Sequence, residues 1–160
     1  MIRLATESDL PRLLEIYDTA KAFMRRSGNP TQWTDSYPGR ALLLEDVGQG
    51  RLYVMERGGR VYACFMLCPG PDPTYSRIDG GAWGSDSPYG VIHRVASDGT
   101  RTGILGRCVA FAGQTFRHLR IDTHGDNRVM QHVLQQLGFH RCGIIYVTED
   151  NDPRIAFEKL

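Results

Sequence analysis

The residues best suited to hold a ligand lie in a turn between an apolar strand and an amphipathic helix. Residues 91–96 have the β-branched, apolar composition of a strand, and residues 97–103 (SDGTRTG) carry no large apolar side chain. A helical pattern opens at Ile104. The first N–H groups of a helix lack intrahelical acceptors, and the helix dipole favours negative charge there. The turn predicts an anion site and a phosphate-bearing ligand; a strand–turn–helix unit that binds nothing is the alternative.

The composition predicts one soluble domain over residues 1–160, long enough to bury a core. The 19 Lys and Arg residues nearly balance the 18 Asp and Glu residues, so no broad basic surface for nucleic acid or an anionic membrane is expected. No apolar stretch approaches the ~20 residues of a membrane span, and residues 1–4 begin as a strand rather than a signal peptide. We expect a cytoplasmic protein whose partner is a small molecule, with no nucleic acid and no membrane.

The four cysteines predict buried free thiols rather than a metal site. Cys64, Cys68, Cys108 and Cys142 fall within expected strands or a helix, with no CxxC pair and no His spacing suited to zinc. We therefore expect no bound metal.

The elements around the turn predict an α/β fold with a mixed, mostly antiparallel central sheet and flanking helices. Strands are expected at residues 2–4, 52–56, 61–67, 91–96, 119–123, 144–147 and 154–159, and helices at residues 9–26, 41–47, 104–112 and 129–137. Ser8 is the expected N-cap of the first helix. The strand–helix–strand unit over residues 91–123 requires a crossover, which predicts a parallel strand pair within the sheet.

Three stretches together resemble the GNAT superfamily of acyl-CoA-dependent N-acetyltransferases along nearly the whole chain. Residues 2–17 (IRLATESDLPRLLEIY) are similar to the family's first strand and helix, and residues 93–112 (HRVASDGTRTGILGRCVAFA) to its acyl-CoA pyrophosphate loop and helix. Residues 126–139 (DNRVMQHVLQQLGF) resemble its asparagine-to-GF helix. The resemblance implies a GNAT-like fold and transfer of an acetyl group from acetyl-CoA to the primary amine of a small molecule, with coenzyme A as product.

The resemblance also implies which residues bind the cofactor. Val95 and Ala96 would pair with the pantetheine arm, Arg101, Thr102, Gly103, Ile104 and Leu105 would cradle the phosphates, and Asn127 would contact the pantetheine or adenosine side. The loop departs from the family pattern Q/R-x-x-G-x-G/A, because only Gly103 fits it and the loop is about two residues shorter in this alignment. Main-chain N–H groups can still bind phosphate, and Arg101 could offset the missing first side chain.

Acetyl transfer by direct attack needs a group that removes a proton from the amine. His93, on the strand that would meet the acyl arm, is the predicted base, and a histidine satisfied within the sheet is the alternative. Leu134 stands where many family members have a tyrosine that protonates the departing thiolate. Either Tyr146 replaces that tyrosine or the thiolate leaves without help.

Two long, aromatic-bearing loops are expected to line the acceptor side of the site. Gln32, Trp33, Tyr75 and Trp83 are the predicted substrate-binding residues, and they indicate a small amine with an apolar or aromatic portion. The sequence has no cluster of acidic residues of the kind that would indicate a polyamine or an aminoglycoside as the acceptor. The altered loop and Leu134 leave a second hypothesis open, a non-catalytic acyl-CoA-binding or sensing domain. The resemblance also allows a homodimer.

Overall fold

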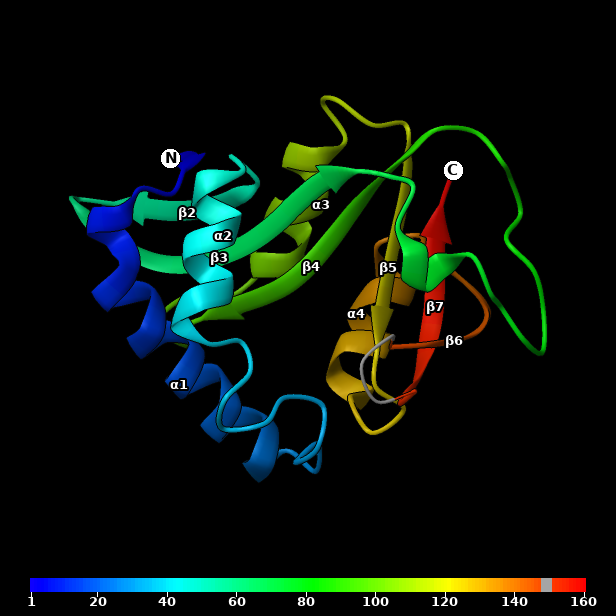
Figure 1. Cartoon of the computed structure of the whole chain (residues 1–160), viewed down its shortest axis with the longest axis horizontal. Coiled ribbons are helices and arrows are strands. Elements are labelled where there is room, and N and C mark those ends of the chain that lie inside the picture. Colours follow the sequence, from blue (N-terminus) through cyan, green and yellow to red (C-terminus); the bar gives the residue numbers. More distant parts are fainter. Residues whose placement is uncertain (148–150) are drawn as a thin grey trace.

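The computed structural model describes residues 1–147 and 151–160 and arranges them around a seven-stranded sheet of order β1-β2-β3-β4-β5-β7-β6 (Figure 1). The strands are β1 (Ile2–Leu4), β2 (Leu52–Arg57), β3 (Arg60–Pro69), β4 (Tyr89–Ser97), β5 (His118–Thr123), β6 (His140–Tyr146) and β7 (Pro153–Lys159). Only the β4–β5 pair is parallel among these strands. The predicted mixed α/β sheet, including its parallel crossover unit, is confirmed.

Helices cover both faces of the sheet. The α-helices are α1 (Leu10–Arg26), α2 (Arg40–Gly48), α3 (Ile104–Ala112) and α4 (Arg128–Gln136), and short 3-10 turns lie at η1 (Glu7–Asp9) and η2 (Pro73–Tyr75). Helices α1 and α2 pack on one face of β2–β4, and α3 and α4 pack on the other. Successive strand residues point to opposite faces, so Val54 and Met55 of β2 enter different cores. None of the described helices is long and apolar enough to cross a membrane.

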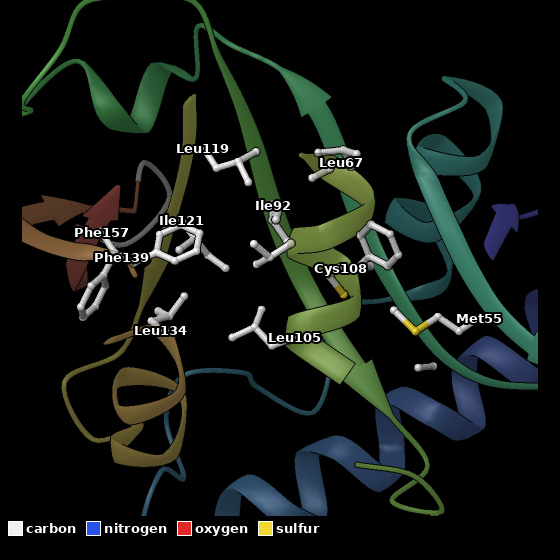
Figure 2. Close-up of a cluster of buried hydrophobic side chains, with 14 of the residues drawn as sticks. Met55, Leu67, Ile92, Leu105, Cys108, Leu119, Ile121, Leu134, Phe139 and Phe157 are labelled. Atoms are coloured by element: carbon white, nitrogen blue, oxygen red, sulfur yellow. The ribbon is translucent and has the colours of Figure 1, made fainter. Parts of the chain in front are cut away.

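The core beneath α3 and α4 fixes the position of the crossover unit. Figure 2 shows Leu105 and Cys108 of α3 and Leu134 of α4 gathered against the sheet, beside Ile92 of β4 and Ile121 of β5. All five side chains are buried. Burying a side chain of this size contributes about 1.5–3 kcal/mol, so this cluster anchors the turn at the head of α3 to the central strands.

Two predictions about local structure are corrected. The first helix is not capped by Ser8, because residues 7–9 form η1 and Asp9 takes the N-cap position of α1. The Asp9 carboxylate accepts hydrogen bonds from the Thr6 N–H and the Arg3 guanidinium, both at 2.8 Å. The cysteines are free thiols, but only Cys64 and Cys108 are fully buried.

The loop between β3 and β4 is held against the β5–β7 end of the sheet. The Arg120 guanidinium lies 4.0 Å from the ring centroids of both Trp83 and Tyr89. The Glu158 carboxylate accepts a hydrogen bond from the Gly84 N–H and lies 3.0 Å from His118 Nε2. The loop therefore has a fixed position over the sheet, although it has little regular structure of its own.

A glycine marks the closest approach of this loop to the sheet. A Cβ atom on Gly81 would lie 1.9 Å from the carbonyl oxygen of Cys142 in β6, whereas a Cβ atom on Gly48 would meet nothing within 4 Å. We expect Gly81→Ala to lower the free energy of unfolding by about 1–3 kcal/mol, because the loop must move off the strand. Gly48→Ala, the matched control, should change it little. Urea denaturation of both variants tests this, and equal stabilities would contradict it.

Candidate active site

A cavity of about 890 Å³ opens where β4 and β5 separate. The two strands pair only from Tyr89–His118 to Val91–Arg120, so residues 92–97 of β4 have no β5 partner. His93, Arg94 and Val95 line the cavity together with residues from the loop after α1, the end of α2 and the loop before η2. The parting of the strands thus exposes a backbone edge in the middle of the sheet.

A bulge in β4 decides which side chains reach this cavity. The β3 register runs from Met66 opposite His93 to Cys64 opposite Ala96, and it skips Arg94 and Val95. Arg94 has φ 52°, a left-handed conformation that is uncommon for a residue other than glycine. Because the bulge breaks the alternation of the strand, the consecutive residues His93 and Arg94 both line the cavity.

His93 lies between two carboxylates. Its Nε2 atom is 2.8 Å from Asp72 Oδ2, and its Nδ1 atom is 3.4 Å from Asp122 Oδ1. The Tyr75 hydroxyl donates to the same Asp122 oxygen at 2.7 Å. A carboxylate can only accept, so the shorter contact assigns the proton of the neutral ring to Nε2, which donates to Asp72. Nδ1, at the longer distance from Asp122, is then the ring nitrogen that can accept a proton.

The charge of Asp72 is maintained by its partners. Burial raises the pKa of Asp72, but the hydrogen bond and charge of His93 and two hydrogen bonds from Thr74 outweigh it and lower the pKa to about 2. Burial and the neighbouring Asp122 raise the pKa of Tyr75 well above its ordinary value, so its phenol stays protonated and remains a donor. Asp72 therefore keeps its negative charge beside His93, and Tyr75 remains a hydrogen-bond donor to Asp122.

A second charged group lines the cavity beside α2. Asp46, which is fully buried, accepts from Arg94 at 2.5 Å and from Arg51 Nε at 2.7 Å. Burial opposes the charge of Arg94, but Tyr37 and Asp46 raise its pKa above the ordinary value. The Tyr17 hydroxyl donates to the Arg94 carbonyl at 2.8 Å and holds the bulge against α1.

Hydrogen bonds join the loop after α1 to the start of α4 and to β7. Gln32 Oε1 accepts from Asn127 Nδ2 at 3.1 Å, and Arg154 donates to the Gln32 carbonyl at 3.1 Å. Asn127 also caps α4 by accepting from the Met130 N–H. The structure therefore brings Gln32, Trp33 and Asn127, three of the residues predicted to bind ligands, to the cavity.

Of the residues predicted to bind the cofactor, Val95 and Asn127 line the cavity, and the others lie in the loop before α3 or in the core. Val95 lines the cavity, whereas Ala96 is buried in the core beneath α1. Gly103 has φ 71° and immediately precedes α3. Thr102 and Gly103 are both exposed, and the Arg101 guanidinium lies 5.2 Å from the centroid of the Tyr62 ring. Ile104 and Leu105 begin the helix with their side chains against the core, so only their backbone N–H groups could meet an anion.

Tyr146, the candidate acid, and Tyr75 and Trp83, two residues predicted to bind the acceptor, lie outside the cavity lining in the described part of the chain. Tyr146 shares a hydrogen bond with Asp79 that raises its pKa, and Arg77 lies 4.4 Å over its ring. It does not line the cavity in the described part of the chain, so its position gives no support to a role as acid. Tyr75 and Trp83 also lie behind the cavity wall, where the Trp83 indole donates to the Tyr75 carbonyl.

Sequence reasoning missed Asp72, Asp122 and the Arg94 cluster. One signal could have identified Asp122: Val91 stands opposite Arg120 in the parallel pair, so two residues further along each strand His93 and Asp122 face each other across the opening. Asp72 lies in an irregular, proline-rich loop, where no periodicity reports its direction. The Arg94 cluster depends on the bulge, which the sequence does not indicate.

The low pKa of Asp72 predicts a pH-dependent contribution to stability. A carboxyl group whose pKa falls on folding stabilises the protein above its unfolded pKa of about 4, and that stabilisation is lost as the pH falls through the folded value. We expect Asp72→Asn to lower the free energy of unfolding by about 1.5–3 kcal/mol at about pH 6, with the deficit shrinking between about pH 4 and pH 2. Urea titrations across this range measure the deficit, with exposed Asp86→Asn as control. A deficit that stays constant down to about pH 2 would contradict the assignment.

Comparison with solved structures identifies the fold. No family model and no curated protein matches the sequence. A GNAT-family acetyltransferase from Streptococcus agalactiae 2603 superimposes with a TM-score of 0.87 at 27% identity, covering 100% of this chain and 94% of that one.

Two further structures share the fold at lower identity. A GNAT-family acetyltransferase from Listeria monocytogenes 4b F2365 gives a TM-score of 0.72 at 16% identity, covering 99% of this chain and 93% of that one. One from Bacillus cereus ATCC 10987 gives 0.62 at 18% identity, covering 100% and 97%. The strand order around the splayed β4–β5 pair and the full-length match to the streptococcal structure show that this chain has the fold of the GNAT acetyltransferases.

Proposed function

We propose that this chain, acting as a single domain, transfers the acetyl group of acetyl-CoA to the primary amine of a small molecule by direct attack of the amine on the thioester. The observation that carries the proposal is the position of His93. It lies on the cavity wall, is held by Asp72, and belongs to the stretch of β4 that has no β5 partner.

The residues present fit acetyl-CoA. The free edge of β4 at residues 92–97 offers backbone groups to an extended amide-containing arm, and the exposed head of α3 offers unpaired N–H groups to phosphate. Asp98 fixes the loop between them by accepting from the Thr100 N–H at 3.0 Å and by pairing with Arg12 at 2.5 Å. When bound there, acetyl-CoA would supply an acetyl thioester, the electrophile of the reaction.

Proton removal is assigned to His93. Asp122 attracts an ammonium group to the His93 Nδ1 side of the cavity, and Nδ1 takes the proton that must leave before the nitrogen can attack. Asp72 orients the ring and stabilises the charged imidazolium through Nε2–H. Tyr75 keeps Asp122 in place through its hydroxyl.

The departing thiolate receives no proton from the position used by many family members. Leu134 is fully buried in the core beneath α4 and has no group to donate. The ordinary pKa of an alkyl thiol is about 8.5, so a thiolate is a tolerable leaving group near neutral pH. We therefore assign the departure of coenzyme A to an unassisted step.

Replacement of His93 tests the assigned base. We expect His93→Gln to lower kcat/KM by about 10²- to 10⁴-fold and to shift the acidic limb of the pH–rate profile, with acetyl-CoA binding retained. Release of the coenzyme A thiol with a panel of amines gives the rates, and exposed His140→Gln is the matched control. An unchanged pH–rate profile in His93→Gln would remove the assigned role.

Obstruction of the α3 head tests the cofactor site. We expect Gly103→Trp to weaken acetyl-CoA binding at least about tenfold, because a large side chain at the helix terminus covers the unpaired N–H groups. Gly58→Trp is a matched control, since Gly58 also has a positive φ and open space around it but lies in the β2–β3 hairpin. Calorimetric titration measures both variants, and equal affinities would place the cofactor elsewhere.

A further inference from the structure

A second charged cluster, formed by Arg94, Asp46 and Arg51, meets the same cavity as the Asp72–His93–Asp122 group. Both arginines line the cavity, and both bind the one buried carboxylate of Asp46. Arg51 also lies 3.4 Å from the Glu45 carboxylate, which is 56% exposed and is screened by solvent. The buried part of the cluster therefore holds two guanidinium groups and one carboxylate.

A structural role alone would require only one arginine. Asp46 can be neutralised by Arg94, whose side chain is only 10% exposed, and α2 would then be fixed to the β4 bulge. Arg51 adds a second positive charge at the cavity wall. Arg94 Nε is buried without a hydrogen-bond partner among the described residues, and Arg51, whose side chain is 25% exposed, keeps donors that a ligand can reach. An excess of fixed donors and positive charge at a cavity wall favours an anionic ligand group.

The carboxylates around His93 and the guanidinium groups beside Asp46 differ in charge, and they are joined by two adjacent residues. His93 and Arg94 are neighbours in β4, and the bulge sends their side chains into the same cavity, one toward Asp72 and Asp122 and the other toward Asp46. Consecutive Cα atoms lie about 3.8 Å apart, so one small molecule can reach both.

We propose that the acceptor of this enzyme is an amine that also carries a carboxylate, with the amine beside His93 and the carboxylate on Arg94 and Arg51. This inference rests on the proposed function and specifies its acceptor class. Asp46 already accepts from both guanidinium groups, so a ligand carboxylate would meet their positive charge and remaining N–H groups, while Asp72 and Asp122 repel it from the His93 side. The cavity would thus bind an amino acid in one orientation, with its nitrogen toward the exposed edge of β4.

The test compares amino acids with the amines that lack only the carboxylate. The pairs are phenylalanine and phenethylamine, leucine and isopentylamine, and lysine and cadaverine, each titrated calorimetrically into the protein with coenzyme A present and each assayed for acetylation with acetyl-CoA. We expect the carboxylate-bearing member of at least one pair to bind at least about tenfold more tightly and to give the higher kcat/KM. Equal or undetectable binding of both members in every pair overturns the inference.

Variants of the two arginines test whether they cause the preference for the carboxylate-bearing amine. Arg51→Gln and Arg94→Lys should each reduce it at least about tenfold; lysine at 94 keeps a charge beside buried Asp46 so that the fold survives. Exposed Arg57→Gln, the matched control, should preserve it. A preference that survives in both cluster variants overturns the assignment. Failure of the proposed function would be distinct, because it would appear as no acetyl-CoA binding and no thiol release with any amine.

Discussion

The bulge at Arg94 is the constraint on which the rest of the site depends. A left-handed conformation at a non-glycine residue costs roughly 1–3 kcal/mol and persists only where its surroundings enforce it. Here the Tyr17 hydroxyl holds the Arg94 carbonyl from α1, and buried Asp46 holds the Arg94 guanidinium from α2. Both helices on that face thus support one strained residue, and the strain provides two adjacent polar side chains in one cavity and a β4 edge free of β5.

Charge separation within the cavity follows from the same bulge. Without it, His93 and Arg94 would point to opposite faces of the sheet, and one of them would enter the apolar core beneath α3 and α4. With it, each of the two side chains has its own carboxylate partners, so neither polar group is buried alone. The polarity that orients a ligand is therefore a property of the backbone as much as of the side chains.

The fold could be predicted from the sequence because its signals are local. The period of the apolar residues in α1 and α4, the paired glycines of the β2–β3 hairpin and the crossover length between β4 and β5 each indicate an element or a connection without reference to the rest of the chain. The cavity wall could be predicted only where it followed such signals, as at Val95 on the central strand. Asp72 and Arg94 reach the cavity through an irregular loop and a bulge, whose directions are set by tertiary contacts that no periodicity encodes.

The loop that carries Asp72 explains why charged residues lie buried far from the cavity. Arg120, His118 and Glu158 are each at most 5% exposed, and burying such groups is costly unless they are paired. An apolar replacement could fill the same space, but it could not bind the loop backbone, whereas Glu158 accepts from Gly84 and Arg120 donates to the Ser85 carbonyl. Trp83, held against Arg120, in turn donates to the Tyr75 carbonyl, and Tyr75 orients Asp122 beside His93. The buried network therefore fixes the loop against the sheet and, through Tyr75 and Asp122, fixes the surroundings of His93. Its energetic cost gives an irregular segment a defined position beside the cavity.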